Sequence, residues 1–220
     1  MRKLALSDEI LMKIEKPARY IGGEFNAIVK DHNEVDTTFA FVFPDVYEVG
    51  MSHLGIQILY DLLNRRDDVC CERVYSPWID LDKIMREQNI PLFSLETQTP
   101  VKNFDFLAIT LQYEMCYTNI LQVLDLSGIP LLSKDRTEDD PIVIGGGLVL
   151  TILSQLQISL TFFISVKVKL NIITLLIYIR KIRKMVEQKR NFLKWLQKFL
   201  VCMFRLSTIL NTTKMEQLKK

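Results

Sequence analysis

Residues 104–128 read "FDFLAITLQYEMCYTNILQVLDLSG", and this stretch decides the fold class. Residues 104–110 are an apolar run with aromatic and branched side chains, which predicts a short buried strand. Residues 117–128 follow helical spacing and end at Gly128, a residue that favours the end of a helix. A strand that passes through a loop into a helix of this length is typical of an α/β domain.

The same alternation continues on both sides of this stretch. Residues 37–43, "TTFAFVF", predict a buried strand that stops at Pro44. A helix is predicted at 53–66, with Leu54, Ile58, Leu59 and Leu62 on one face. The remaining predicted elements are strands at 70–76 and 91–95, a helix at 78–89, and the segments 129–133 and 141–146, which complete the pattern.

Strands that alternate with helices in this way predict a mainly parallel, doubly wound sheet with right-handed crossovers. In such sheets, ligands bind beyond the carboxyl ends of the strands. That rule selects three loops, at residues 44–55, 111–119 and 145–147. The candidate cofactor-binding residues in and next to these loops are Tyr47, Gly50, Ser52, His53, Gly55, Thr110, Gln112, Gly145, Gly146 and Gly147.

The composition changes abruptly after Gly147. Residues 1–147 carry 14 Lys and Arg against 24 Asp and Glu, a net charge of −10, whereas residues 148–220 carry 14 against 2, a net charge of +12. All 8 glycines and all 7 prolines lie in the first part. A folded domain normally needs such residues where its chain reverses, so the second part is atypical.

The four cysteines, Cys70, Cys71, Cys116 and Cys202, match no disulfide framework, zinc motif or iron–sulfur motif in their spacing. Cys70 and Cys71 fall in a predicted strand, where free cysteines behave as small apolar side chains. The first ten residues, "MRKLALSDEI", contain no apolar core of a signal peptide. We therefore expect a reduced, cytoplasmic protein with no metal site.

Several blocks of residues 17–147 together resemble a bacterial family of B12-binding radical SAM proteins. They are "ARYIGGEFN", "FPDVYEVGMSHLGIQILYDLLN", "CERVYSPW", "PLFSLET", "FDFLAITLQYEMCYTNILQVLDLSGIPLL" and "DPIVIGGG". The resemblance implies a Rossmann-like, cobalamin-binding-type domain that is followed by a radical SAM barrel. In that barrel, a CxxxCxxC motif holds a [4Fe–4S] cluster that binds S-adenosylmethionine.

This chain departs from the family at two places. It contains no CxxxCxxC, so we expect neither the cluster nor S-adenosylmethionine here, and we assign no catalytic residue. The cobalt-ligating histidine of better-known B12 domains lies in a D-x-H-x-x-G pattern, but His53 has Met51 in place of the Asp and Ile56 in place of the Gly. We therefore expect His53 to open or cap a helix, with Gly50 and Gly55 allowing a turn and close packing.

In the family, the glycine turn continues as GGP-C-A-x-N-P-E-P, where this chain has "LVLTILSQLQ". With suitable synonymous codons, one restored base after the Gly147 codon makes this segment read PCAYNPEPIA. The leading hypothesis is therefore a truncated, inactive fragment of a B12-binding radical SAM enzyme, with a lead-in at 1–36, the cobalamin-type domain at 37–147 and an out-of-frame tail at 148–220.

Two alternatives remain open. One is a stand-alone cobalamin-type binding module. The other is an α/β protein associated with a membrane, because residues 148–165 carry no charge and residues 180–184 are "RKIRK". Residues 180–199 also show roughly helical hydrophobic spacing with many basic residues, a pattern found in helices that bind anionic lipid. We expect no nucleic-acid partner, and membrane contact only if the tail is genuine.

Overall fold

The computed structural model describes residues 6–146 and 162–164. The chain divides into two compact units, residues 1–166 and 167–220, and all the described residues belong to the first unit. Gly147 and the predicted segments within 148–220 lie outside the described residues, apart from residues 162–164. Within the described ranges, no helix combines the length and hydropathy that crossing a membrane requires.

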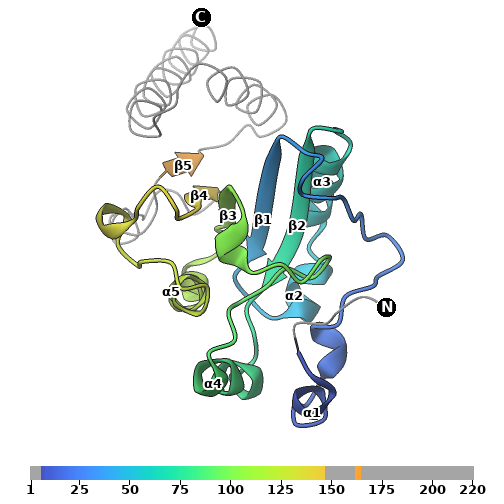
Figure 1. Cartoon of the computed structure of the whole chain (residues 1–220), viewed down its shortest axis with the longest axis vertical. Helices are drawn as coiled ribbons and strands as arrows, with labels where there is room; N and C mark the ends of the chain where they lie inside the picture. Colours follow the sequence, from blue (N-terminus) through green and yellow to red (C-terminus); the bar gives the residue numbers. More distant parts are fainter. Residues whose placement is uncertain (1–5, 147–161, 165–220) are drawn as a thin grey trace, which may run out of the picture. The chain divides into compact units, whose positions relative to one another are not determined.

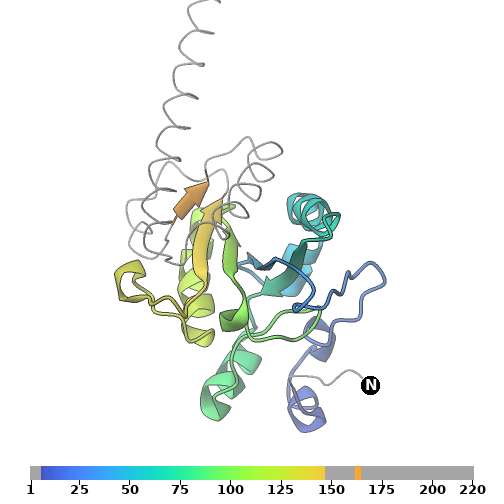
Figure 2. The ribbon, with the colours of Figure 1, turned by 45° about the horizontal axis from the view of Figure 1, so that its top comes forward.

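The predicted parallel α/β sheet is confirmed (Figure 1). Its strands lie in the order β2-β1-β3-β4-β5, and every neighbouring pair is parallel. Four strands form its main part, and the short β5 lies alongside β4 (Figure 2). The bounds are β1 (Thr37–Phe43), β2 (Val69–Tyr75), β3 (Phe106–Thr110), β4 (Ile142–Gly146) and β5 (Phe162–Ile164).

Helices cover both faces of the sheet. The described helices are α1 (Asp8–Leu11), α2 (Tyr47–Met51), α3 (Leu54–Asn64), α4 (Ile79–Gln88) and α5 (Tyr117–Leu126), with 3-10 turns at Pro17–Arg19, Val101–Asn103, Glu114–Cys116 and Ser133–Asp135. The main core joins side chains of the sheet, such as Val42 and Leu107, to Met85 of α4 and Ile120 of α5. The opposite face packs against α3, as in a doubly wound sheet.

Gly128 ends α5 as predicted. It takes a left-handed conformation with φ of 64°, and the Ile129 amide donates to the Leu124 carbonyl at 2.9 Å. This backbone geometry favours glycine, because the residue has no Cβ to clash with its own carbonyl. The turn directs the chain away from α5 and towards β4.

The face that α3 buries differs from the predicted one. Ile56, Tyr60 and Leu63 are buried, whereas Leu54 and Ile58 are 71% and 45% exposed. Apolar residues occur around most of this helix, so two stripes were compatible with helical spacing. The direction from which α3 crosses the sheet selected one stripe and left the other in solvent.

The predicted strand at 91–95 is wrong, and the segment 129–133 also contains no strand. Phe93 forms only an isolated bridge with Pro100. The segment instead runs along the open edge of β2, where the Leu95 amide donates to the Arg73 carbonyl at 2.8 Å and the Arg73 amide donates to Glu96 Oε2 at 2.7 Å. These bonds satisfy edge groups that would otherwise be free to pair with another chain.

The lead-in contributes to the hydrophobic core, and the segment after Gly147 contributes to the sheet, which the sequence did not suggest. Leu6, Ile10 and Ile14 of the N-terminal segment are buried in the main core. At the other end, β5 pairs with β4 beyond the expected limit of the sheet, with Phe162 opposite Ile144 and Ile164 opposite Gly146. The sheet therefore does not stop at Gly147.

Candidate ligand site at the carboxyl edge of the sheet

The strand order creates a topological switch point between β1 and β3. From β1 the chain crosses over to β2 on one side, and from β2 it returns past β1 to β3 on the other. Loops that leave β1 and β3 consequently diverge, and ligands of doubly wound proteins bind in the crevice between such loops. This places the candidate site at residues 44–53 and 111–116.

One side-chain contact joins the two loops across the switch point. The Tyr113 hydroxyl, in the loop after β3, donates a hydrogen bond to the Asp45 carboxylate, in the loop after β1. Close by, the Asn119 side-chain amide of α5 donates to the Pro44 carbonyl at 2.9 Å. The two loops are thus held together by polar contacts at the point where the fold expects a ligand.

Asp45 also connects to the loop after β2. Its carbonyl accepts from the Ser76 amide at 3.0 Å, and its Oδ1 accepts from the Val46 amide at 2.7 Å. Burial, together with the neighbouring carboxylate, raises the pKa of Tyr113 to about 12. The tyrosine therefore remains a neutral donor at physiological pH, and Asp45 is the common anchor of three loops.

His53 caps α3, as the sequence predicted. Its Nδ1 accepts a hydrogen bond from the Ile56 amide at 3.3 Å, and its ring lies 5.3 Å from the ring of Phe43. A Cβ on Gly55 would approach His53 Cε1 to 2.8 Å, so the absence of a side chain there makes room for the imidazole. The capping role uses one of the two ring nitrogens.

Gly50 is required for close packing at this edge. A Cβ there would lie 2.4 Å from Tyr75 Cε1 and 2.9 Å from Phe43 Cδ1, both closer than side chains approach one another. Gly50 thus allows α2 to lie directly against the ends of β1 and β2. This is a packing role, in agreement with the sequence-based interpretation of Gly50.

The other predicted site residues lie in several different environments. Ser52 is exposed and its hydroxyl donates to the Val49 carbonyl at 3.1 Å, whereas Thr110 is buried and donates to the Val42 carbonyl at 3.1 Å. Gln112 is half-buried in the loop after β3. Gly145 and Gly146 are the last residues of β4 and pair with β3, so they form part of the sheet and not a free glycine loop.

Tyr47 belongs to a polar network beside β2. Its hydroxyl donates to Glu24, whose other carboxylate oxygen lies 2.6 Å from Arg73 Nη2. Arg73 Nε in turn donates to the fully buried Glu96 at 2.6 Å, and the guanidinium lies 4.8 Å from the centre of the Tyr60 ring. The network compensates a buried guanidinium with two carboxylates.

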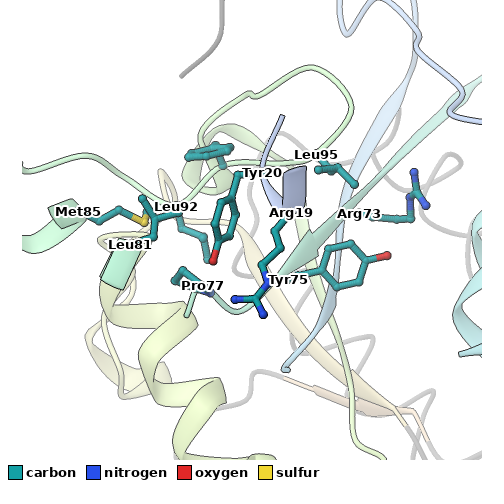
Figure 3. Close-up of a pocket in the computed structure, with 10 residues that line it drawn as sticks. Arg19, Tyr20, Arg73, Tyr75, Pro77, Leu81, Met85, Leu92 and Leu95 are labelled. Carbon is teal, nitrogen blue, oxygen red and sulfur yellow. The ribbon is translucent and has the colours of Figure 1, made fainter. Parts of the chain in front are cut away.

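A small cavity of about 20 Å³ lies next to the carboxyl end of β2, lined by Arg19, Tyr20 and Tyr75 together with apolar side chains (Figure 3). Arg19 Nη1 and the Tyr75 hydroxyl are both buried without a hydrogen-bond partner in the described part of the chain. The volume suits one or two water molecules, and water would satisfy both groups. The cavity is far too small for a cofactor.

Sequence reasoning missed Asp45, Tyr113 and Asn119. All three lie within loops that it had selected, or next to them, but only the fold shows that they contact each other. The usable signal was the position of an acid shortly after one buried strand, β1, and of a tyrosine shortly after another, β3. Nothing in the sequence specified that these two strands are neighbours.

The strand order and the crevice define a doubly wound α/β domain of the flavodoxin-like order. The family model for "Radical SAM proteins, N-terminal" matches residues 55–203, which is more than half of the chain. The chain therefore belongs to this family of radical SAM N-terminal domains.

One curated relative is an uncharacterized protein, MJ0966, from Methanocaldococcus jannaschii. It is 26% identical over 110 residues, which cover 49% of this chain but only 18% of that protein. The matched part thus spans less than a fifth of the relative's length. No solved structure matches the chain.

Proposed function

We propose that this chain provides the cobalamin-type binding domain of a B12-binding radical SAM enzyme, with its ligand at the β1/β3 switch point. The contact between Tyr113 and Asp45 supports this proposal most, because it orders two polar loops where doubly wound domains receive ligands. Membership of the radical SAM N-terminal family supports the enzyme class. Asp45, Tyr113 and the exposed or half-buried members of the ten candidate residues are the proposed ligand surface, and the buried Gly50, Thr110 and Gly145 support it from α2 and the sheet.

The residues fit cobalamin only without histidine ligation to cobalt. His53 Nδ1 accepts from the Ile56 amide, which places the proton of the neutral ring on Nε2, and the residues before and after His53 depart from the D-x-H-x-x-G pattern. The ligand would therefore contact backbone groups and neutral polar side chains at the carboxyl edge of the sheet. Val49, Met51 and Leu54 are exposed apolar side chains on α2 and the start of α3, and they offer contact area to the apolar rim of a macrocycle.

In this proposal the chain binds but performs no radical chemistry by itself. The sequence contains no CxxxCxxC, so the three thiolates of a radical SAM cluster are not present at the required spacing. In intact relatives, the cluster and S-adenosylmethionine belong to the barrel that the resemblance implies. The proposed role of this chain is therefore confined to holding a ligand.

We further propose that residues 148–220 are an out-of-frame product, on account of their lack of glycine and proline and their reversed charge. The rival proposal, that the segment is a genuine continuation, is favoured by β5 and by a family match that runs to residue 203. Sequencing the gene beyond the Gly147 codon separates them. A CxxxCxxC region in another frame supports the first proposal, and its absence overturns it.

Cobalamin binding is tested with the full chain by desalting after incubation and recording the absorption spectrum. We expect retention by the parent chain and at least about tenfold weaker binding by Asp45→Ala and Tyr113→Phe, because both remove the side-chain hydrogen bond between the two loops. Asp139→Asn is the control, since Asp139 is an exposed residue before the amino end of β4. Loss of cobalamin from the parent, or equal binding by all variants, would overturn the proposed site.

A further inference from the structure

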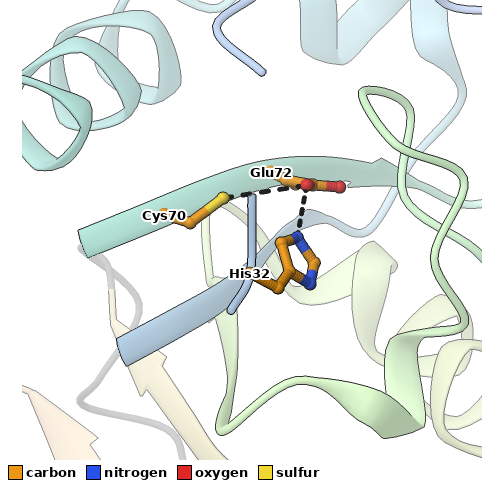
Figure 4. A group of neighbouring side chains, drawn as sticks. All are labelled: His32, Cys70 and Glu72. Carbon is orange, nitrogen blue, oxygen red and sulfur yellow. Dashed lines mark hydrogen bonds and ion pairs between the residues drawn. The ribbon is translucent and has the colours of Figure 1, made fainter. Parts of the chain in front are cut away.

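Three side chains with metal-binding chemistry meet on β2, near the amino end of that strand and away from the switch point. They are His32 of the N-terminal segment and Cys70 and Glu72 of β2 (Figure 4). His32 Nε2 lies 2.7 Å from Glu72 Oε1, and Cys70 Sγ lies 3.7 Å from the same oxygen. All three possible ligand atoms lie within 4.8 Å of one another.

The strand and the preceding segment together produce this cluster. Residues two apart on a strand project from the same face, so Cys70 and Glu72 point to one side of β2. His32 reaches them from a segment 38 residues earlier than Cys70 in the sequence. Its ring packs edge-on against Phe104, with 5.1 Å between the ring centres, and this contact holds the imidazole in place.

The carboxylate of Glu72 is oriented by a second layer of contacts. The Thr97 hydroxyl donates to Glu72 Oε2 at 2.6 Å, and the Thr97 amide donates to the same oxygen at 3.2 Å. Oε2 is thus engaged, while Oε1 faces the histidine and the cysteine. Support of this kind is typical of metal ligands, whose outer contacts fix their orientation.

We propose that His32, Cys70 and Glu72 form a Zn²⁺ site with an open fourth position for water. Imidazole nitrogen, thiolate sulfur and carboxylate oxygen are the three ligand types that zinc accepts in proteins. Neutral imidazole with one thiolate and one carboxylate balances the charge of the ion, which suits a site where Cys70 and Glu72 are both fully buried. The His32 side chain is 23% exposed and provides a route from solvent.

The geometry requires adjustments of about an ångström, because the three ligand atoms lie within 4.8 Å of one another and tetrahedral zinc ligands lie about 3.5 Å apart. A tetrahedral zinc separates nitrogen and oxygen ligands by about 3.4 Å and sulfur and oxygen ligands by about 3.6 Å, from the usual bond lengths. The sulfur–oxygen distance already agrees with this value, and the His32–Glu72 pair must widen by somewhat less than an ångström. Rotation of the partly exposed imidazole can provide that change.

Zinc binding would displace a proton from the thiol. Burial, together with the Glu72 charge, raises the pKa of Cys70 to about 12 in the metal-free protein, while the charge of Lys30 acts in the opposite direction. Bonds form from zinc to Cys70 Sγ and to His32 Nε2: the thiol proton leaves to solvent, and the Nε2 proton that the hydrogen bond to Glu72 holds there moves to Nδ1 or leaves to solvent.

The test measures Zn²⁺ binding to the full chain after treatment with a chelator, by isothermal titration and metal analysis. We expect one zinc per chain and a higher melting temperature. Cys70→Ser and His32→Gln should each weaken binding at least about tenfold, since each removes a ligand. Cys71→Ser is the matched control, because Cys71 is equally buried but points to the opposite face of β2.

A second measurement does not depend on the folding of the variants. Co²⁺ added to the parent chain should give the intense absorption of a cobalt–thiolate bond, and Zn²⁺ should abolish it. The proposal is overturned if the parent binds no zinc, if the cobalt spectrum contains no thiolate band, or if Cys70→Ser and Cys71→Ser bind zinc equally. No cobalamin is present in these experiments, so their outcome is independent of the switch-point proposal.

Discussion

The hydroxyl of Tyr113 donates a hydrogen bond to the carboxylate of Asp45, which lies 68 residues earlier in the sequence. This contact joins the loops that diverge from the central strands β1 and β3. Because the backbone carbonyl of Asp45 also accepts from the Ser76 amide, this one residue connects the loops after three strands of the sheet. Asp45 and Tyr113 therefore order the candidate site, together with the hydrogen bond from Asn119 to the Pro44 carbonyl.

Tyr113→Phe should lower the free energy of unfolding by about 1–2 kcal/mol, because it removes a hydrogen bond to a charged acceptor. Urea denaturation measures this loss. Tyr117→Phe is the matched control, since the Tyr117 hydroxyl is buried without a hydrogen-bond partner in the described part of the chain. Removing that hydroxyl should leave stability unchanged or raise it slightly. Equal effects of the two variants would show that the hydrogen bond from Tyr113 to Asp45 does not stabilise the folded chain.

Gly50→Ala should destabilise the domain by about 1–3 kcal/mol, because the new methyl group would overlap the Tyr75 ring and displace α2. Gly55→Ala should cost less, since its closest neighbour is the end of the His53 side chain, which can rotate away. Alanine is also the better helix former. Thermal melts of the two variants compare these effects, and a Gly50→Ala variant as stable as the parent would contradict the packing shown here.

Arg19 should control the titration of Glu48. Its hydrogen bond is the largest influence on Glu48 and lowers the pKa of that carboxyl to about 2. The ionised pair stabilises the folded state above about pH 4.5, and this contribution is lost as the pH falls towards 2. In Arg19→Gln, the pKa measured by carboxyl NMR should rise towards 4.5. Lys16→Gln should shift it less, because Lys16 is exposed and lies 3.3 Å from the carboxylate.

The three described cysteines should be unreactive in the folded chain. Cys70, Cys71 and Cys116 are buried, and burial raises the pKa of each thiol. The thiolate is the reactive form, so a disulfide reagent at pH 8 should modify none of them before unfolding. A Cys202→Ser variant removes the fourth cysteine, so that the number of modified thiols refers to these three residues. Rapid modification of Cys71 in native buffer would show that β2 opens readily.

Anaerobic reconstitution with iron and sulfide should give no [4Fe–4S] cluster on this chain. Its four cysteines lack the spacing that places three thiolates around one cluster. Iron analysis and the visible spectrum provide the measurement. A stoichiometry of about four irons per chain would contradict the proposal that the chain is a binding domain alone.

The sequence by itself determined the main strands, the end of α5 and the fold class. The run "TTFAFVF" before Pro44 and the run 104–110 are too apolar and β-branched or aromatic to be anything but buried strands at this length, and both are strands in the structure. Gly128 ends its helix because local backbone geometry requires it. His53 caps α3 for a similarly local reason. Features of this kind depend on neighbours within a few residues, so a sequence contains the information directly.

The tertiary structure alone decided which residues meet. Strand order brought Tyr113 to Asp45, and the path of the N-terminal segment brought His32 to Cys70 and Glu72. The tertiary structure also determined which face of α3 is buried. It placed the apolar segment 91–95 along the open edge of β2. Hydrophobic periodicity indicates that one face of a helix or strand is buried, but it does not identify the element that covers this face. Contacts between distant residues follow from how strands are ordered and crossed, and that order is a property of the whole chain.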